Sequence, residues 1–313
     1  MTATTSDTRA DTQFGHLAVF YETGQDYLDQ VGAFVRDGLA AREPVLVAVP
    51  AARLPMLRRA LNGAADAVTF TDMSQLGRNP SRIIPAVRRF TDAHPGRTRF
   101  VGEPIWAGRA EAETREATRH EALINAAFSG VPTTILCPYD RAGLDSQILE
   151  QAYQTHPQIA AHGTARPSRA YTGIDLALAI AGQPPPPAPA DAAVLSYDRG
   201  NLGRVRRFTR DLAARAGLAG EVLDDQVIAV HELATNTIAH AHGHGTLRIW
   251  TRSDRLVCEV TDTGQIRDLL AGCRSSGAQE GEHGLYVVHQ VCDLVEVRSG
   301  SFGTNIRVYR DLA

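Results

Sequence analysis

Two polar side chains one helical turn apart, Glu232 and Asn236, form the most chemically specific pattern in this chain. At about 100° per residue they share one side of a predicted helix with His240. The opposite side is apolar and consists of Leu223, Val227, Val230, Ala234 and Ile238. At this spacing a carboxylate can act as a base while the neighbouring amide offers its oxygen to Mg²⁺. This division of roles suits phosphoryl transfer.

A second chemical element follows the alternating stretch 256–260, which predicts a strand. Asp262 comes at the end of this strand, where its carboxylate could accept a hydrogen bond from an adenine amino group. Gly264 permits a turn at a point where the backbone must pass close to a ligand.

Two more glycine-containing segments complete the pattern. The segment Gly281-Glu282-His283-Gly284 precedes a predicted helix, 285–291, whose free N–H groups would attract a phosphate. Gly303 and Thr304 open the last predicted strand, 305–309, where a hydroxyl could close the floor of a pocket.

In this order the four segments resemble the N, G1, G2 and G3 boxes of the GHKL ATPases, and their compact spacing resembles the anti-sigma factor and serine-protein kinase branch of that family. The resemblance covers about residues 194–313 and implies a Bergerat α/β two-layer sandwich, in which a mixed sheet is covered on one face by helices. It also implies ATP and Mg²⁺ as cofactors. By this resemblance Glu232 is the catalytic base, Asn236 holds Mg²⁺ and Asp262 recognises adenine. The cofactor-binding set is completed by His240, Gly264, Gly281, His283, Gly284, Leu285 and Thr304.

The first glycine box departs from the family's D-x-G-x-G pattern, because Ile266 stands where the second glycine is usual. Residues 265–280 would form a lid over the nucleotide. Arg267 or Arg274 in this lid could reach a γ-phosphate, although arginines in mobile loops are more often only solvated.

The resemblance implies a cytoplasmic regulator that holds a sigma factor and phosphorylates a serine or threonine of an anti-anti-sigma (STAS) protein. A homodimer is expected from the family. Two alternatives stay open. The first, favoured by the altered glycine box, is a binding switch, dependent on ATP or not, without kinase activity. The second is an atypical sensor histidine kinase, because His120-Glu121 and His231-Glu232 resemble a phosphoacceptor pair.

Composition limits the chemistry further, because all 32 basic residues are arginine. The absence of lysine excludes a Walker A loop, a eukaryotic-type protein kinase and a Schiff base. The net charge of −3 argues against direct nucleic-acid binding. Six arginines between 199 and 215 lie on a predicted amphipathic helix, as a solvated face or a partner-docking surface.

The four cysteines show no C-x-x-C spacing and predict reduced, buried thiols. No segment of 18 apolar residues occurs, and the N-terminus lacks an apolar signal region, so we expect a cytoplasmic protein without membrane contact.

Length and composition predict two domains. We expect a flexible tail at 1–14, a first domain at 15–181, a stiff proline-rich linker at 182–193 and a second domain at 194–313. In the first domain, buried strands at 45–49, 68–70, 100–101 and 133–137 alternate with helices at 27–41, 54–61, 83–92 and 111–128. This alternation predicts a doubly wound α/β fold.

Polar residues follow several of these strands, at the edge where an open α/β sheet usually binds ligands. The group consists of Asp72, Glu103, Trp106, Tyr139 and Asp140. Individually such carboxylates are often helix caps or turn formers. The stretches 16–21, 102–106, 120–125 and 137–140 resemble the MEDS sensory domain, which implies a RecA-like sensor of small organic signals. The five residues are therefore a candidate sensor pocket.

Overall fold

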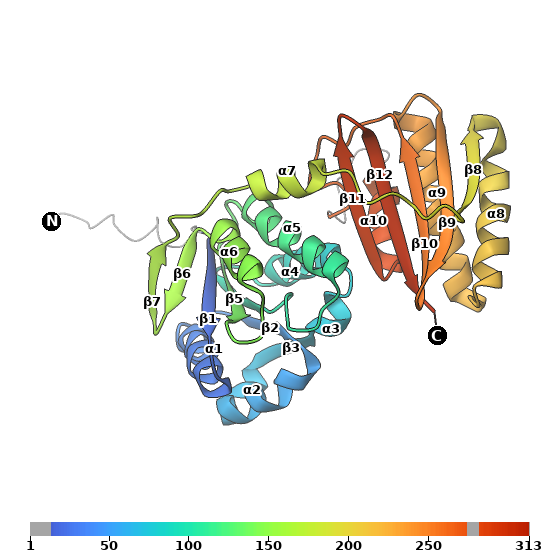
Figure 1. The fold of residues 1–313 in the computed structure, drawn as a ribbon. Helices are drawn as coiled ribbons and strands as arrows, with labels where there is room; N and C mark the ends of the chain where they lie inside the picture. Colours follow the sequence, from blue (N-terminus) through green and yellow to red (C-terminus); the bar gives the residue numbers. More distant parts are fainter. Residues whose placement is uncertain (1–13, 274–281, 313) are drawn as a thin grey trace. The chain divides into compact units, whose positions relative to one another are not determined.

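The computed structural model describes residues 14–273 and 282–312, and the chain divides into two compact units, 1–177 and 178–313 (Figure 1). No helix within the described part of the chain is long and apolar enough to cross a bilayer.

The first unit contains a seven-stranded sheet with the order β3-β2-β4-β5-β1-β6-β7. All neighbouring strands in it are parallel except β6 and β7, which are antiparallel. The strands are β1 Gly15–Tyr21, β2 Val45–Val49, β3 Val68–Asp72, β4 Thr98–Gly102, β5 Thr133–Asp140, β6 Gln158–Ala161 and β7 Thr164–Pro167.

Helices cover both faces of this sheet, so the predicted doubly wound α/β fold is confirmed. Figure 1 shows α1 and α2 on one face and α4, α5 and α6 on the other. The α1/α2 side is closed by an apolar cluster that includes Val31, Val47 and Leu57. The helices are α1 Gly24–Ala40, α2 Leu54–Leu61, α3 Met73–Leu76, α4 Ile83–Ala93, α5 Glu111–Ala127 and α6 Ser146–Thr155. A further helix, α7 Asp175–Gly182, spans the boundary between the units.

The second unit contains a five-stranded sheet with the order β11-β12-β10-β9-β8. Its strands are β8 Ala193–Asp198, β9 His244–Arg252, β10 Arg255–Asp262, β11 Leu294–Gly300 and β12 Gly303–Asp311. Every pairing is antiparallel, so the expectation of a mixed sheet was wrong. Strands β10 and β11 run parallel to each other, but β12 lies between them and pairs antiparallel with both.

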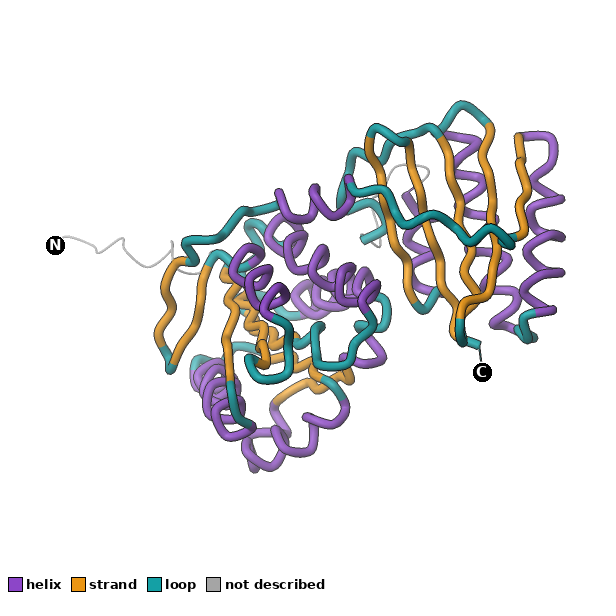
Figure 2. The backbone as a smooth tube through the Cα atoms, viewed as in Figure 1, coloured by secondary structure: helices purple, strands orange, loops and turns teal. Residues whose placement is uncertain are grey.

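Within the described residues, helices cover one face of this sheet, which gives the predicted two-layer sandwich (Figure 2). They are α8 Leu202–Arg215, α9 Gly220–His240 and α10 Glu282–Val291. The predicted apolar side of α9 faces the core, where Val230 and Ala234 are fully buried beside Leu247 and Val308. Burial of this side stabilises the helix and leaves its polar side free for chemistry.

The other face of the second sheet carries charged residues. In one row across three strands, Glu259 of β10 forms ion pairs with Arg307 of β12 (2.7 Å) and Arg248 of β9 (3.3 Å). The proline-rich segment crosses this face, and the guanidinium of Arg307 donates a hydrogen bond to the carbonyl of Pro186 (Figure 1). This hydrogen bond anchors the segment to the sheet.

Candidate functional site

A cavity of about 550 Å³ in the second unit collects most of the predicted nucleotide-contacting residues. Its polar lining includes Asn236, His240, Asp262, Gly264 and Thr304. Its apolar lining includes Leu233, Val260, Leu285 and Ile306. Cavities that hold small ligands are roughly 300–1,000 Å³ and combine apolar walls with a few polar groups. This cavity fits that description.

Asp262 is held in place by two hydrogen bonds. The Thr237 hydroxyl donates to one carboxylate oxygen and the Gly264 N–H donates to the other, both at 2.8 Å. Behind Thr237, the hydroxyl of Tyr197 donates to the Thr237 oxygen at 3.1 Å. Burial raises the pKa of Tyr197 to about 12, so it stays a donor at neutral pH. Each carboxylate oxygen keeps a lone pair for a further donor, such as an exocyclic amino group.

Close contacts at this site leave no room for a side chain at positions 264 and 303, so glycine is required at both. A Cβ at Gly264 would lie 2.8 Å from the Cβ of Ala241, just after α9. A Cβ at Gly303 would lie 2.1 Å from the carbonyl oxygen of Asp262, and the φ of Gly303 is +96°. Thr304 then donates a hydrogen bond to the carbonyl of Gly264 at 2.9 Å. The first and third glycine boxes therefore hold each other in position.

Ile266 occupies the place of the missing second glycine without a positive φ. Its N–H donates to the Ser299 hydroxyl at 2.8 Å, and its side chain packs against the core and lines the cavity. The loop therefore accommodates a side chain at this position through ordinary backbone geometry. Arg267 of the predicted lid also lines the cavity.

Glu232 and Asn236 face the first turn of α10. A Cβ at Gly284 would lie 2.7 Å from the nearer carboxylate oxygen of Glu232 and 3.5 Å from the Asn236 amide. The N-terminal end of α10 thus lies beside the predicted base and Mg²⁺ ligand, and helix N-termini favour phosphate. Gly281, Arg274 and the side chain of His283 lie outside the described residues, so the roles expected of them stay predictions.

Comparison with known proteins agrees with this geometry. Residues 195–310 match the histidine kinase-like ATPase domain family, and residues 15–157 match the family described as MEDS, the methanogen/methylotroph DcmR sensory domain. The serine-protein kinase RsbW of Halalkalibacterium halodurans is 32% identical over 113 residues, a match that covers 32% of this chain and 70% of that protein.

The chain belongs to the RsbW family of histidine kinase-like ATPases.

A further RsbW, from Bacillus velezensis, is 30% identical over 115 residues, which are 32% of this chain and 72% of that protein. A crystal structure of the RsbU and RsbW domains of a Mycobacterium tuberculosis protein aligns at 17% identity and a TM-score of 0.30, over 66% of this chain and about half (49%) of that chain. A score this low does not establish a common overall fold.

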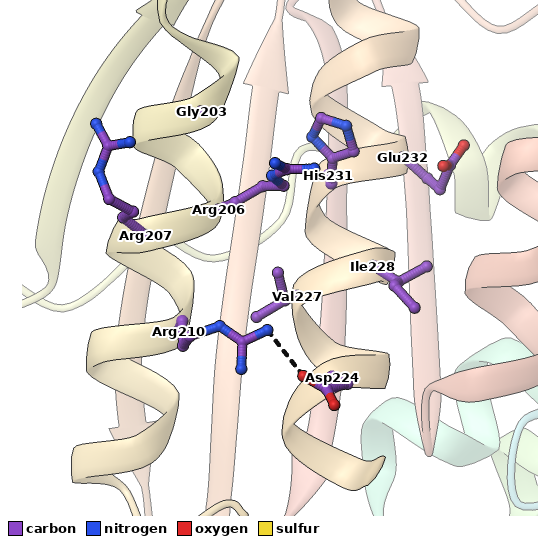
Figure 3. A pocket seen from close by; sticks show the side chains of 9 residues that line it. All are labelled: Gly203, Arg206, Arg207, Arg210, Asp224, Val227, Ile228, His231 and Glu232. Carbon is purple, nitrogen blue, oxygen red and sulfur yellow. Dashed lines mark hydrogen bonds and ion pairs between the residues drawn. The ribbon is translucent and has the colours of Figure 1, made fainter. Parts of the chain in front are cut away.

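A second hollow of the RsbW-like unit lies between α8 and α9 (Figure 3). Arg206, Arg207 and Arg210 line it from α8, and Arg210 forms an exposed ion pair of 2.8 Å with Asp224 of α9. His231 and Glu232 of α9 also line this hollow, and Figure 3 shows His231 near Arg206, with the Glu232 side chain on the side of α9 away from α8. Burial and the positive charge of Arg206 lower the pKa of His231.

In the MEDS-like unit, Glu103 is the most strongly coordinated of the predicted pocket residues. It is 1% exposed and accepts hydrogen bonds from Tyr21 (3.1 Å), Tyr27 (3.2 Å) and Arg53 Nε (3.0 Å). Burial raises the pKa of Glu103 to about 7 against the opposing effect of Arg53. None of these three partners was predicted as a pocket residue. The signal for Arg53 was its place just after β2, at the same sheet edge as Glu103.

The other four predicted pocket residues do not all gather around Glu103. Asp140 lies 3.8 Å from Arg53 and accepts hydrogen bonds from the backbone of the turn 142–143, while Asp72 caps α3 by accepting from Ser74 N at 2.9 Å. Trp106 lies under the guanidinium of Arg109, 4.5 Å from the ring centroid. Tyr139 is buried and contacts His156 edge-on at 5.5 Å. The small-molecule pocket therefore stays a proposal, centred on Glu103, Arg53 and Asp140.

Proposed function

We propose that the RsbW-like unit binds Mg-ATP and transfers a phosphoryl group to a serine or threonine of a partner protein. One observation carries this proposal. Residues from three separate segments, Asn236 on α9, Asp262 at the end of β10 and Thr304 on β12, line one cavity, and the first turn of α10 lies beside the carboxylate of Glu232. The printed name of the relatives, serine-protein kinase, supports the same reaction.

The residues present suit the cofactors. The oriented carboxylate of Asp262 would accept a hydrogen bond from adenine, and the apolar walls would cover its ring. Asn236 would offer its amide oxygen to Mg²⁺, a hard cation that prefers oxygen ligands. The N-terminal turn of α10, with Gly284 in it, would contact the phosphates. Mg-ATP supplies the phosphoryl group when it is bound.

Glu232 would act as the base. Its side chain is half-buried and lies on the polar side of α9, one turn from Asn236. It would accept the proton of the attacking hydroxyl while the helix dipole of α10 and the metal ion offset the charge on the phosphates. Substituting Glu232 by glutamine would remove the base and keep the shape of the side chain.

The partners are proposed from the family resemblance. A sigma factor would be bound by the unit, a STAS-type antagonist would be its phosphorylation substrate, and the MEDS-like unit would control the exchange in response to a small organic ligand. The arginines of the α8/α9 hollow are a candidate docking surface for an acidic partner segment. A homodimer is part of the same proposal.

Two observations bear on the alternative functions, a histidine kinase and a binding switch without kinase activity. His120 is 3% exposed, which leaves it inaccessible as a phosphoacceptor. Ile266, in the place of a glycine, lines the cavity and favours a switch that binds a nucleotide or a partner without phosphoryl transfer.

The decisive experiment is a transfer assay with γ-labelled ATP, the full chain and a panel of purified STAS proteins from the same organism. We expect an acid-stable label on one STAS protein with the wild type, and its loss with Glu232→Gln, which should still bind Mg-ATP. An acid-labile label on the chain itself would instead indicate a histidine kinase. Nucleotide binding without any label would leave the binding switch.

A further inference from the structure

Four buried side chains from four different elements converge inside the MEDS-like unit. They are His16 on β1, Glu121 on α5, Cys137 on β5 and His156 directly after α6. Each offers one ligand atom, and these atoms all lie within 4.8 Å of one another. All four side chains are 0–1% exposed. Nothing in the proposed kinase reaction uses them.

The hydrogen bonds of the two histidines fix which ring nitrogen carries the proton. His16 Nδ1 lies 3.1 Å from Asn125 Oδ1, and the Asn125 amide nitrogen is committed to the carbonyl of Thr155 at 2.8 Å. His156 Nδ1 lies 2.8 Å from the carbonyl of Ala152 and 2.9 Å from the Thr155 hydroxyl, which donates its own hydrogen to the carbonyl of Gln151 at 3.0 Å. Because Asn125 Oδ1 and the Ala152 carbonyl oxygen carry no hydrogen, both Nδ1 atoms are donors. In the neutral rings, both Nε2 atoms therefore carry a lone pair.

Both of these nitrogens lie close to the same carboxylate oxygen. His156 Nε2 lies 3.0 Å from Glu121 Oε2, and His16 Nε2 lies 3.3 Å from it. His16 Nε2 also lies 3.5 Å from Cys137 Sγ. Protonating both rings would place two imidazolium ions with centroids 4.0 Å apart around one carboxylate in the protein interior. Protonating only one ring would leave the other lone pair against the carboxylate oxygen.

A divalent cation bound among these atoms removes the repulsion between the Nε2 lone pairs and the carboxylate oxygen. Two neutral imidazoles, one carboxylate and one thiolate bring a charge of −2, which a divalent ion neutralises. Metal bonds of about 2.0–2.3 Å to nitrogen, oxygen and sulfur place tetrahedral ligand atoms roughly 3.3–3.8 Å apart. The three distances of 3.0, 3.3 and 3.5 Å given above between Nε2, Oε2 and Sγ atoms are close to this range. The Nδ1 hydrogen bonds to Asn125 and Ala152 are the outer-shell contacts that orient metal-binding histidines.

We propose that these four side chains bind one divalent transition-metal ion of the zinc type. Nitrogen and thiolate ligands favour such an ion over Mg²⁺ or Ca²⁺. The Cys137 thiol gives up its proton to solvent as the sulfur–metal bond forms. Since all four positions of a tetrahedron are filled by protein atoms, the ion would have a structural role and connect β1, β5, α5 and α6.

The test uses the full chain without a histidine tag. Metal content is measured on the purified protein, and chelator-treated protein is then titrated with Co²⁺, which reports tetrahedral geometry in its visible spectrum and thiolate ligation in a near-ultraviolet charge-transfer band. We expect about one Co²⁺ per chain, the charge-transfer band, and displacement by Zn²⁺. Cys137→Ala should lose the band and bind the ion far more weakly.

Two further variants test whether the cobalt signal depends on these particular ligands and on the hydrogen bond that orients His16. Cys258→Ala removes another buried cysteine, in β10 of the RsbW-like unit, and should leave the cobalt spectrum unchanged. Asn125→Leu keeps all four ligands but removes the acceptor for His16, and should weaken metal affinity about 10–100-fold. A wild type that is metal-free and gives no charge-transfer band with Co²⁺ overturns the proposal. So does a band that survives in Cys137→Ala.

Discussion

The contact between Gly303 and Asp262 gives the sharpest prediction about the proposed nucleotide site. Gly303→Ala forces a residue with a side chain to keep φ near +96° and places its Cβ 2.1 Å from the Asp262 carbonyl. A strained backbone of this kind costs about 1–3 kcal/mol. Relieving the overlap requires a shift of the Asp262 backbone, which costs about 1–3 kcal/mol more. We therefore expect a loss of about 2–6 kcal/mol of stability in the second unit.

Gly243→Ala is the matched control. Gly243 has a φ of +83°, but a Cβ there would meet nothing within 4 Å. It should show only the backbone cost, about 1–3 kcal/mol, and should leave Mg-ATP affinity unchanged. The lower chain entropy of the unfolded state affects both substitutions equally, so their difference isolates the overlap.

The assay is urea unfolding followed by the fluorescence of Trp250 on β9, in a Trp106→Phe background that removes the signal of the first unit. Where Gly303→Ala still folds, its Mg-ATP affinity should fall because Asp262 is displaced. Equal losses of stability in the two variants, or unchanged nucleotide affinity in Gly303→Ala, would refute the contact as the link between the glycine boxes.

Three further predictions follow. Burial raises the pKa of Glu103 from 4.5 to about 7, so its stabilising contribution is present below about pH 4.5 and is lost as the pH rises to 7. The first unit should therefore lose about 3 kcal/mol of unfolding free energy between about pH 4 and 8, and Glu103→Gln should abolish this loss in urea unfolding measured over the same range. Thr237→Val removes one of the two hydrogen-bond donors to Asp262, so calorimetry should show weaker Mg-ATP binding and unfolding should show a loss of about 1–3 kcal/mol. Arg210→Ala removes an exposed ion pair and should not change the melting temperature measurably; a clear drop would contradict its assignment as a surface contact.

The fold was predictable where burial alone determines the spacing of apolar residues along the sequence. Strand β2, Val45–Val49, and helix α2, Leu54–Leu61, begin and end where the sequence indicated, since a central parallel strand is uniformly apolar and α2 is amphipathic. Helix α6 was not predicted, because within it only Ala152 and Thr155 are buried. The antiparallel second sheet was also missed, because strand order depends on contacts between distant segments.

The site was predictable in residue type but not in its supporting contacts. Asn236 and Asp262 were predicted from the motif. The side-chain donor to Asp262, Thr237, was not, because it lies on the buried side of α9 and has the sequence pattern of an ordinary core residue. The cluster of His16, Glu121, Cys137 and His156 was not predicted as a unit. Three of its members lie in the stretches that resemble the MEDS domain, but His156 directly follows the unpredicted helix α6, and no local spacing connects the four side chains.

Calorimetry of Mg-ATP binding tests the central claim most directly, with the wild type beside Asn236→Ala, Asp262→Asn and the Gly243→Ala control. The account predicts micromolar binding by the wild type and the control, and its loss in the other two variants, because one lacks the metal ligand and the other the carboxylate that recognises adenine. Absence of binding by the wild type, or binding that survives both substitutions, would contradict the assignment of this cavity as the nucleotide site.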